Sequence, residues 1–390
     1  MDKIHTIPEI STRLKKTDNL LMDLLKIRMD LALEVERRKD LEGEEDPKKK
    51  IIFNPKRETE RLAGVDTWAR KHGINRHFAR TILYAVIGES CKQQMIQMQK
   101  RKQKKTRKGH ALTSEEKEKQ WQSILRRNLL TLTRKWSETY DTEYETAFFA
   151  TRAYREFEDG VITEEIDGLS GDTKVLLDLG CATGKVAFKF ANRFERTVGY
   201  DISPHMVNKA NSKIATSGTK NISFKVTDLE NGIPEPDHSV SMVVMNLGTA
   251  SDIRGISKIV KEISRVLRPH GRFVLSFYNR EALLYNWDFI PWQVGLAAVV
   301  NTYKDCLDVP FGTKLLSVYA RPYSSEEVTE IVKGGVTLSQ ILTYPTISAL
   351  LPTDLFENQP KIQKSVKDMD RQLAGELAGA YIIVTGQKTR

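Results

Sequence analysis

The sequence has little of the chemistry that defines several large protein classes. Its three cysteines, Cys91, Cys181 and Cys306, are far apart and form neither a disulfide framework nor a metal-binding spacing. Its longest apolar runs are only strand-length, and no apolar segment of the signal-peptide kind follows the N-terminus. We therefore expect a protein of the reducing cytoplasm, with no metal site and no membrane span.

Length and composition indicate a globular protein with more than one domain. The chain has 390 residues, of which 40% are hydrophobic, and this is enough for two domains of ordinary size. Its formal charge is +10, and seven of the nine residues in 100–108 are Lys or Arg. Such a run is typical of a solvated connector, and a patch that binds nucleic acid is the alternative interpretation.

The segment Val175–Gly184 has the pattern of a buried strand that runs into a glycine turn. Gly180 and Gly184 allow backbone geometry that a Cβ atom would obstruct. The spacing fits neither a phosphate loop, which needs four residues between its glycines, nor the dinucleotide fingerprint, which needs a third glycine. Because ligands of parallel α/β sheets bind at the carboxyl ends of strands, this turn predicts a nucleotide-type cofactor site.

Strands and helices alternate after this turn. Asp201 ends the next predicted strand, 23 residues after Asp178, and Asp228 follows the third. Two plainer interpretations stay open, in which Asp201 caps the helix that begins near Ser203 and Asp228 belongs to a surface turn. The predicted strands are 175–179, 197–201, 222–226, 241–246, 272–276, 337–342 and 380–385, with a turn at 268–271 and a capping motif at 324–327.

This order of strands, turn and acids resembles the class I S-adenosyl-L-methionine (SAM) methyltransferases. The resemblance implies a Rossmann-like, seven-stranded α/β domain with SAM as its cofactor. Asp201 would accept the ribose hydroxyls, Asp228 would lie beside the adenine amino group, and Asp178 would orient the turn and meet the methionine amino group. The implied cofactor contacts are Asp178, Gly180, Cys181, Gly184, Asp201, Ile202, Asp228, Leu229 and Asn246.

Residues 1 to about 100 contain three predicted helices and no strand pattern. The first helix runs from about Pro8 to Leu41, and Arg28 and Lys39 fall on one face of it, because eleven residues make about three helical turns. The second begins at Asn54-Pro55, and the third covers about 75–100 with Ile82 facing inward. The apolar stripe of the first helix is Leu14, Leu21, Leu24, Leu25, Leu31, Ala32 and Val35.

These helices resemble the all-helical chorismate mutases. The resemblance implies that Arg28 and Arg57 hold substrate carboxylates, that Lys39 and Gln94 hydrogen-bond the ether oxygen, and that Glu58 binds the ring hydroxyl. Burying cations without partners is costly, so these cations should meet carboxylates or a bound anion. The apolar stripe further predicts a homodimer through this domain.

Two positions depart from the mutase pattern. Ser11 stands where the family has an arginine supplied across the dimer interface, and Asn54 stands where aspartate is usual. Three interpretations therefore stay open: an active mutase, a domain that binds anions or dimerises without turnover, and a purely structural helical bundle.

The sequence thus predicts a multidomain α and α/β enzyme. Its parts are a chorismate mutase-like domain at 1–103, a basic helical connector at 104–134 and a SAM methyltransferase at 135–390. Aromatic residues and arginines in 136–154 and 277–323, Trp287 and Trp292 among them, favour a small aromatic or carboxylated acceptor such as chorismate, prephenate or a related compound.

Two alternatives use the same SAM site for other chemistry. One is an RNA-modifying methyltransferase that holds nucleic acid through residues 100–108. The other resembles the prephenate-dependent carboxy-SAM synthases, in which Arg280 or Arg321 would bind the new carboxylate.

Overall fold

The computed structural model divides the chain into two compact units, residues 1–111 with 312–314 and residues 112–311 with 315–390. Each unit is described by itself. The basic run 100–108, Asn54, Trp287 and Trp292 lie outside the described residues. The described residues are 6–42, 55–76, 78–80, 82–83, 86–87, 89–90, 93–94, 97, 114–145, 149–171, 173–283, 299–301, 305–311, 314–333, 336–350 and 359–389.

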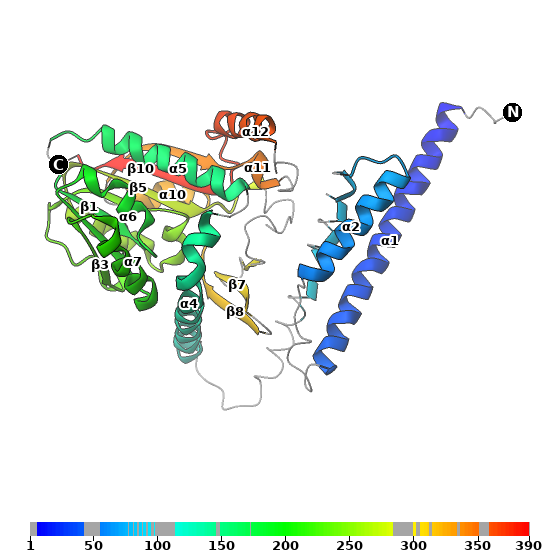
Figure 1. Ribbon diagram of the computed structural model, residues 1–390, viewed down its shortest axis with the longest axis horizontal. Helices are drawn as coiled ribbons and strands as arrows, with labels where there is room; N and C mark the ends of the chain where they lie inside the picture. The colour runs from blue at the N-terminus through cyan, green and yellow to red at the C-terminus, as the bar shows by residue number, and fades with distance from the viewer. Residues whose placement is uncertain are drawn as a thin grey trace. The chain divides into compact units, whose positions relative to one another are not determined.

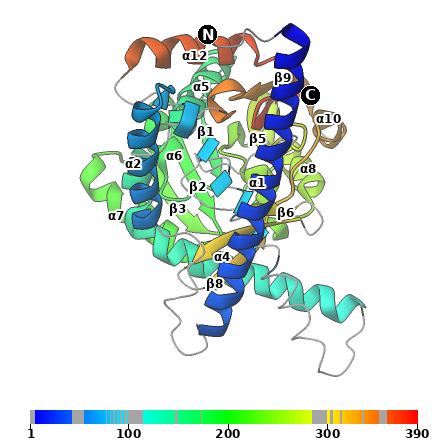
Figure 2. The ribbon, with the colours of Figure 1, turned by 90° about the vertical axis from the view of Figure 1, so that its right-hand side faces the viewer.

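The described residues of the first unit are mainly helical. Helix α1 spans Ile7–Glu42 as one continuous helix (Figures 1 and 2), which confirms the predicted long helix to within a residue at each end. Helix α2 spans Pro55–Lys71, and the described positions from 78 to 97 are helical. Asn75 caps that third segment, since its Oδ1 accepts the Phe78 N–H at 3.2 Å.

Within one copy of this unit, much of the apolar surface stays uncovered. Ala32 and Ile87 are buried, but Leu14, Leu21 and Leu24 are 60%, 47% and 54% exposed. The prediction that Ile82 faces inward is wrong for the single chain, because its side chain is 44% exposed.

The second unit is built on one seven-stranded sheet with the order β3-β2-β1-β4-β5-β10-β9. The five strands β3, β2, β1, β4 and β5 run parallel to one another, and β10 is antiparallel to both of its neighbours, β5 and β9. This is the predicted Rossmann-like arrangement, with an antiparallel strand inserted near one edge. The strands are β1 Val175–Leu179, β2 Arg196–Asp201, β3 Ile222–Val226, β4 Val240–Met245, β5 Leu267–Tyr278, β9 Thr337–Tyr344 and β10 Tyr381–Gln387.

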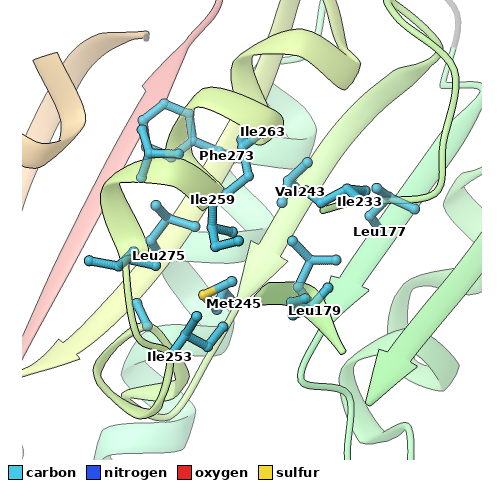
Figure 3. Packing of buried hydrophobic residues seen from close by; sticks show 14 of the residues in the cluster. Leu177, Leu179, Ile233, Val243, Met245, Ile253, Ile259, Ile263, Phe273 and Leu275 are labelled. Carbon is cyan, nitrogen blue, oxygen red and sulfur yellow. The ribbon is translucent and has the colours of Figure 1, made fainter. Parts of the chain in front are cut away.

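Helices cover both faces of the sheet, so β1 and β4 are buried along their whole length and are mainly apolar. Leu177 and Val243 point to the face covered by α8 (Ile256–Val266) and α10 (Ser325–Lys333), and Figure 3 shows the packing against α8. Leu176 and Val244 point to the other face. That face is covered by α5 (Phe149–Asp167), α6 (Lys185–Phe190) and α12 (Pro360–Gln372), while α7 (Pro204–Ser217) packs beside β3.

Strand β5 differs from its prediction. We expected a turn at 268–271 and a strand from Arg272, but β5 already begins at Leu267. The register runs from Val240 opposite Leu267 to Met242 opposite Arg272, so β5 holds three extra residues at this point. These residues form a bulge rather than a separating turn, and His270 within it has a φ of +61°.

A long helix and a second sheet complete this unit. Helix α4 spans Ser114–Glu145, and the small sheet contains β6 (Val299–Asn301), β7 (Cys306–Phe311) and β8 (Lys314–Tyr319). Leu132 of α4 packs against Val309 and Val318, and α4 lies beside β8 in both views (Figures 1 and 2). The remaining elements are α11 Ile347–Leu350 and the short helical turns η2 Ala191–Arg193, η3 Leu229–Asn231 and η4 Thr249–Asp252.

No helix in the described parts of the chain is both long and apolar enough to cross a membrane.

Candidate functional site

The glycine turn after β1 is held against the end of β2. The backbone N–H groups of Gly180 and Cys181 both donate to the Tyr200 carbonyl, at 2.7 and 3.0 Å. Gly180 and Gly184 have φ angles of +75° and +83°, which favour glycine. A Cβ atom on Gly180 would also overlap the Cγ2 methyl group of Thr249. The predicted need for glycine is thus confirmed at both positions by the backbone conformation, and at Gly180 also by the lack of room for a side chain.

Asp201 ends β2 and binds the turn through its carboxylate. Its Oδ2 accepts the Ala182 N–H at 2.9 Å, and its Oδ1 accepts the Ser203 N–H at 2.8 Å. The cap of α7 is instead Ser203, which accepts the Met206 N–H at 3.4 Å. Burial raises the pKa of Asp201, and the two backbone hydrogen bonds oppose that shift. Each carboxylate oxygen can still accept a further hydrogen bond.

Asp178 lies on β1 and is almost fully buried. Its Oδ2 accepts the Ala187 N–H of α6 at 3.1 Å, whereas its Oδ1 has no hydrogen-bond partner among the described residues. Burial raises the pKa of Asp178 to about 7, with a further contribution from repulsion by Asp201 and Glu158. A buried carboxylate oxygen without a partner is suited to an ammonium group supplied by a ligand.

The other predicted cofactor residues follow β2, β3 and β4. Asp228 begins η3 and accepts the Glu230 N–H at 3.1 Å through Oδ1, and Leu229 beside it is buried. Ile202 is partly buried after β2. Asn246 follows β4, and its carbonyl accepts both the N–H and the hydroxyl of Thr249. Since β3, β2, β1 and β4 are adjacent and parallel, the structure brings all nine predicted residues to one edge of the sheet.

Helix α4 crosses this edge and is tied to it at two places that the sequence did not reveal. Arg126 donates to Asp228 at 2.6 Å. Asp141 accepts the Thr183 hydroxyl at 2.6 Å and the Lys213 ammonium at 2.9 Å. The two ties are fifteen residues apart, or about 22 Å along a helix, which is enough to span a nucleoside and an amino acid.

Glu158, a buried carboxylate on α5, was not among the predicted site residues. It accepts the Tyr154 hydroxyl at 2.7 Å and the Leu247 N–H at 3.0 and 3.2 Å. Burial raises the pKa of Glu158 to about 7. The available signal was an acid on the apolar face of α5, four residues after Tyr154.

The helical unit brings together two of the five predicted mutase residues. Arg28 donates to the Ser90 hydroxyl at 3.2 Å, and Gln94, one turn after Ser90, donates to the Ala32 carbonyl at 2.8 Å. The Oε1 atom of Gln94 is buried without a partner among the described residues. Lys39 lies on α1 and Arg57 and Glu58 on α2, but their side chains are outside the described part of the structure.

Two family models match the chain, one in each of the two units. Residues 170–331 match the methyltransferase domain model, and residues 10–95 match the chorismate mutase type II model. The chain thus combines a region similar to the chorismate mutase type II family with a region similar to the methyltransferase domain family. Helices α4 and α5, which carry Arg126, Asp141 and Glu158, precede the range of the methyltransferase model.

Two curated relatives that resemble the chain are methyltransferases. The uncharacterized methyltransferase YcgJ of Bacillus subtilis is 31% identical over 100 residues, which cover 26% of this chain and 39% of that protein. The arsenite methyltransferase of Halobacterium salinarum is 29% identical over 189 residues, covering 46% of this chain and 47% of that protein. The chain thus spans less than half the length of either relative.

Among solved structures, YcgJ from Bacillus subtilis aligns with a TM-score of 0.40 and 20% identity, covering 60% of this chain and 99% of that one. A second solved structure is the geranyl diphosphate C-methyltransferase of Streptomyces coelicolor with S-adenosyl-L-homocysteine. It aligns with a TM-score of 0.41 and 15% identity, covering 60% of this chain and 78% of that one.

The residues considered for acceptor binding have other contacts in the methyltransferase unit. Arg280 and Arg321 both pair with Glu327, at 2.7 and 3.1 Å. Glu327 also completes the predicted capping motif of α10, because it accepts the Ser324 N–H and donates its own N–H to the Ser324 hydroxyl. Within the described ranges, no group of three or more His, Cys, Asp or Glu side chains could hold a metal ion.

The raised pKa of Asp178 predicts how folding stability depends on pH. The carboxyl group of Asp178 binds its proton more tightly in the native state than in the unfolded chain. Its contribution to the free energy of unfolding is therefore complete below the ordinary pKa of aspartate and is lost as pH rises through about 7. Urea denaturation from pH 4 to pH 8 should therefore show that Asp178→Asn flattens this decline. Asp167→Asn, at an exposed carboxylate paired with Arg193, is the matched control and should follow the wild type. An unaltered pH profile in Asp178→Asn would contradict the assignment.

Proposed function

We propose that the second unit is a SAM-dependent methyltransferase that acts on a small aromatic or carboxylated acceptor. The observation that carries this proposal is the set of acids around the glycine turn. Asp178 has a buried oxygen without a described partner, Asp201 has remaining acceptor capacity, and Asp228 lies on the adjoining strand end. These three acids match the three donor groups of SAM, which are the methionine ammonium, the ribose hydroxyls and the adenine amino group.

Bound SAM would supply an activated methyl group on a sulfonium. The chain's own contribution is to bind and orient: Asp178 would hold the amino group, Asp201 the ribose and Asp228 the adenine, with α4 closing the open side of the site. Methyl transfer is an in-line displacement, for which positioning of the acceptor supplies most of the rate. The aromatic side chains considered for the acceptor in 136–154 include Trp136, which packs against the small sheet, and Tyr154, which is buried.

For the first unit we propose an anion pocket that binds chorismate or prephenate. Support comes from the contact of α1 with the third helix, where Arg28 donates to the Ser90 hydroxyl at 3.2 Å and Gln94, one turn after Ser90, donates to the Ala32 carbonyl at 2.8 Å. Lys39, Arg57 and Glu58 would complete this pocket from α1 and α2. Arginine is suited to binding a carboxylate because its planar guanidinium group can donate two parallel hydrogen bonds to the two carboxylate oxygens.

We also propose that the chain forms a homodimer through α1 and that it works in the cytoplasm. The dimer would cover the leucines of α1 that are exposed in one copy. The location is supported by the scarcity of cysteine, and Cys181 and Cys306 are both buried thiols.

Removal of the Asp201 carboxylate should weaken SAM binding. Asp201→Ala loses two charge-assisted hydrogen bonds to the ribose, at a cost of about 1.5–3 kcal/mol. Titration calorimetry measures this loss. Asp237→Ala, at an exposed carboxylate paired with Arg265, should leave the affinity unchanged. Equal SAM affinity in a folded Asp201→Ala protein would refute the ribose assignment, and a wild type that binds no SAM would refute the proposed function.

The anion pocket should be detectable by thermal shift. Chorismate, prephenate or a bicyclic transition-state mimic should raise the melting temperature of the wild type, since a ligand that binds only the folded state stabilises it. Arg28→Ala should abolish the shift. Arg38→Ala, on an exposed residue of α1 paired with Glu34, should preserve it. If none of the three ligands stabilises the wild type, the domain is not a chorismate or prephenate pocket.

The dimer predicts a mass of twice 44.5 kDa for the full chain in light scattering. Replacing both Leu21 and Leu24 with Glu should give the monomer mass, because burying two new charges in the interface is costly. Lys16→Glu, at an already exposed polar position of α1, should stay dimeric. A monomeric wild type at micromolar concentration would rule the interface out.

A further inference from the structure

Glu158 reaches the end of β4 from a helix that precedes the matched methyltransferase range. Its side chain is 2% exposed, and it holds the N–H of Leu247 in the loop 246–249. Leu247 and Gly248 are consecutive residues with positive φ angles, +53° and +77°. The Glu158 carboxylate accepts the Leu247 N–H at 3.0 and 3.2 Å, and the Ser276 hydroxyl accepts the Gly248 N–H at 2.7 Å. Two side chains from outside the loop thus hold its backbone, and one of them carries a negative charge when ionised.

The loop held by Glu158 contacts the cofactor turn directly. Thr249 lies so close to Gly180 that a Cβ atom on the glycine would overlap its methyl group. The backbone conformation of the loop places this threonine, because Thr249 is bonded through both its N–H and its hydroxyl to the Asn246 carbonyl. Glu158 therefore influences the position of the cofactor turn through the loop 246–249, which contacts both.

The covalent structure of SAM places its sulfonium near this contact. The sulfonium joins the amino-acid chain to the ribose, so it lies between the amino group at Asp178 and the ribose at Asp201. The turn that begins at Gly180 connects these two positions. Burial, and in addition repulsion by Asp201 and Glu158, raises the pKa of Asp178, so the charge of Glu158 acts on a group beside the cofactor turn.

We propose that Glu158 is a positioning and specificity-determining residue, which fixes the loop 246–249 against the cofactor turn and whose negative charge favours cationic SAM over the neutral thioether S-adenosyl-L-homocysteine (SAH). The inference rests on the proposed SAM site. It assigns to α5 a role in product release, because loss of the sulfonium charge on methyl transfer removes the attraction to Glu158 while the contacts to the ribose and the amino group persist.

The charge of Glu158 is set by the groups that face it. These are Tyr154 and Asp159 on its own helix and Asp178 on β1, and Tyr381 of β10 stacks on the Tyr154 ring. Burial raises the pKa of Glu158 to about 7, so its carboxylate becomes ionised between pH 6 and pH 8. Asp178 ionises in the same range, but it faces the amino group that SAM and SAH share. The ratio of the two affinities therefore reports the charge near the sulfonium, and comparison of the wild type with Glu158→Gln separates the part due to Glu158 from the part due to Asp178.

The test is titration calorimetry of the full-length protein with SAM and with SAH at pH 6 and pH 8. In the wild type, the preference for SAM over SAH should rise by about fivefold between the two pH values, as expected for partly screened unit charges. Glu158→Gln keeps an oxygen for the Leu247 N–H but removes the charge, so it should lower the preference for SAM and reduce the pH dependence of that preference. Glu158→Leu removes the hydrogen bond as well and should weaken both ligands.

Glu165→Gln is the matched control. Glu165 is a second buried carboxylate on the same face of α5, two turns further on, and it pairs with Arg272 at 2.9 Å. This variant should keep the wild-type preference and its pH dependence.

Several outcomes would overturn the proposal. If Glu158→Gln keeps the wild-type SAM/SAH ratio at both pH values, Glu158 does not discriminate by charge. If Glu158→Leu binds both ligands as the wild type does, it does not position the loop. Should either variant fail to fold by circular dichroism, a wild-type ratio that is independent of pH would by itself overturn the charge assignment. A wild type that binds neither ligand refutes the proposed function and this inference together, whereas normal wild-type binding with unchanged variants refutes the inference alone.

Discussion

The Tyr200 carbonyl at the end of β2 accepts two hydrogen bonds from the turn after β1, and the geometry of the cofactor site depends on this contact. It holds Gly180 and Cys181 against the neighbouring strand, so the next N–H, from Ala182, reaches the Asp201 carboxylate. Space for this arrangement exists only because the two glycines have no Cβ atom. Parallel pairing of β1 with β2 and β4 then brings Asp178, Asp201 and Asn246 to one edge.

The sequence was sufficient to predict the elements of this edge, because a buried parallel strand has an apolar run and a tight turn needs glycine. Other features depend on partners that are distant in the chain. Arg126 and Asp228 are 102 residues apart, and no local pattern relates them. The bulge at 268–271 resembles a turn in sequence because proline and glycine occur together, and only the pairing of β5 with β4 reveals it as part of a strand. Glu158 gave a local signal, an acid on an apolar helix face, without indicating what it binds.

The two domains place polar groups inside their cores in different ways. In the methyltransferase unit, Asp201 and Glu158 are satisfied by backbone N–H groups of turns, so burying them also fixes loop conformation. In the mutase-like unit, the half-buried Arg28 and the buried Gln94 donate to the Ser90 hydroxyl and the Ala32 carbonyl, and these two hydrogen bonds join two helices. Each unit thus uses the same side chains to hold its fold together and to prepare its predicted ligand site.

Helices α4 and α5 show that a boundary drawn from sequence similarity need not be a boundary for folding. The methyltransferase match begins at residue 170, yet Phe149, Tyr154 and Ile162 of α5 are buried in the core on one face of the sheet. Asp141 of α4 holds Thr183 and Lys213. A fragment cut at the start of the match would expose that apolar face to water and remove these partners. The unit that folds is therefore longer than the matched range, and a transplant of this domain into another protein would have to carry both helices to keep its core covered.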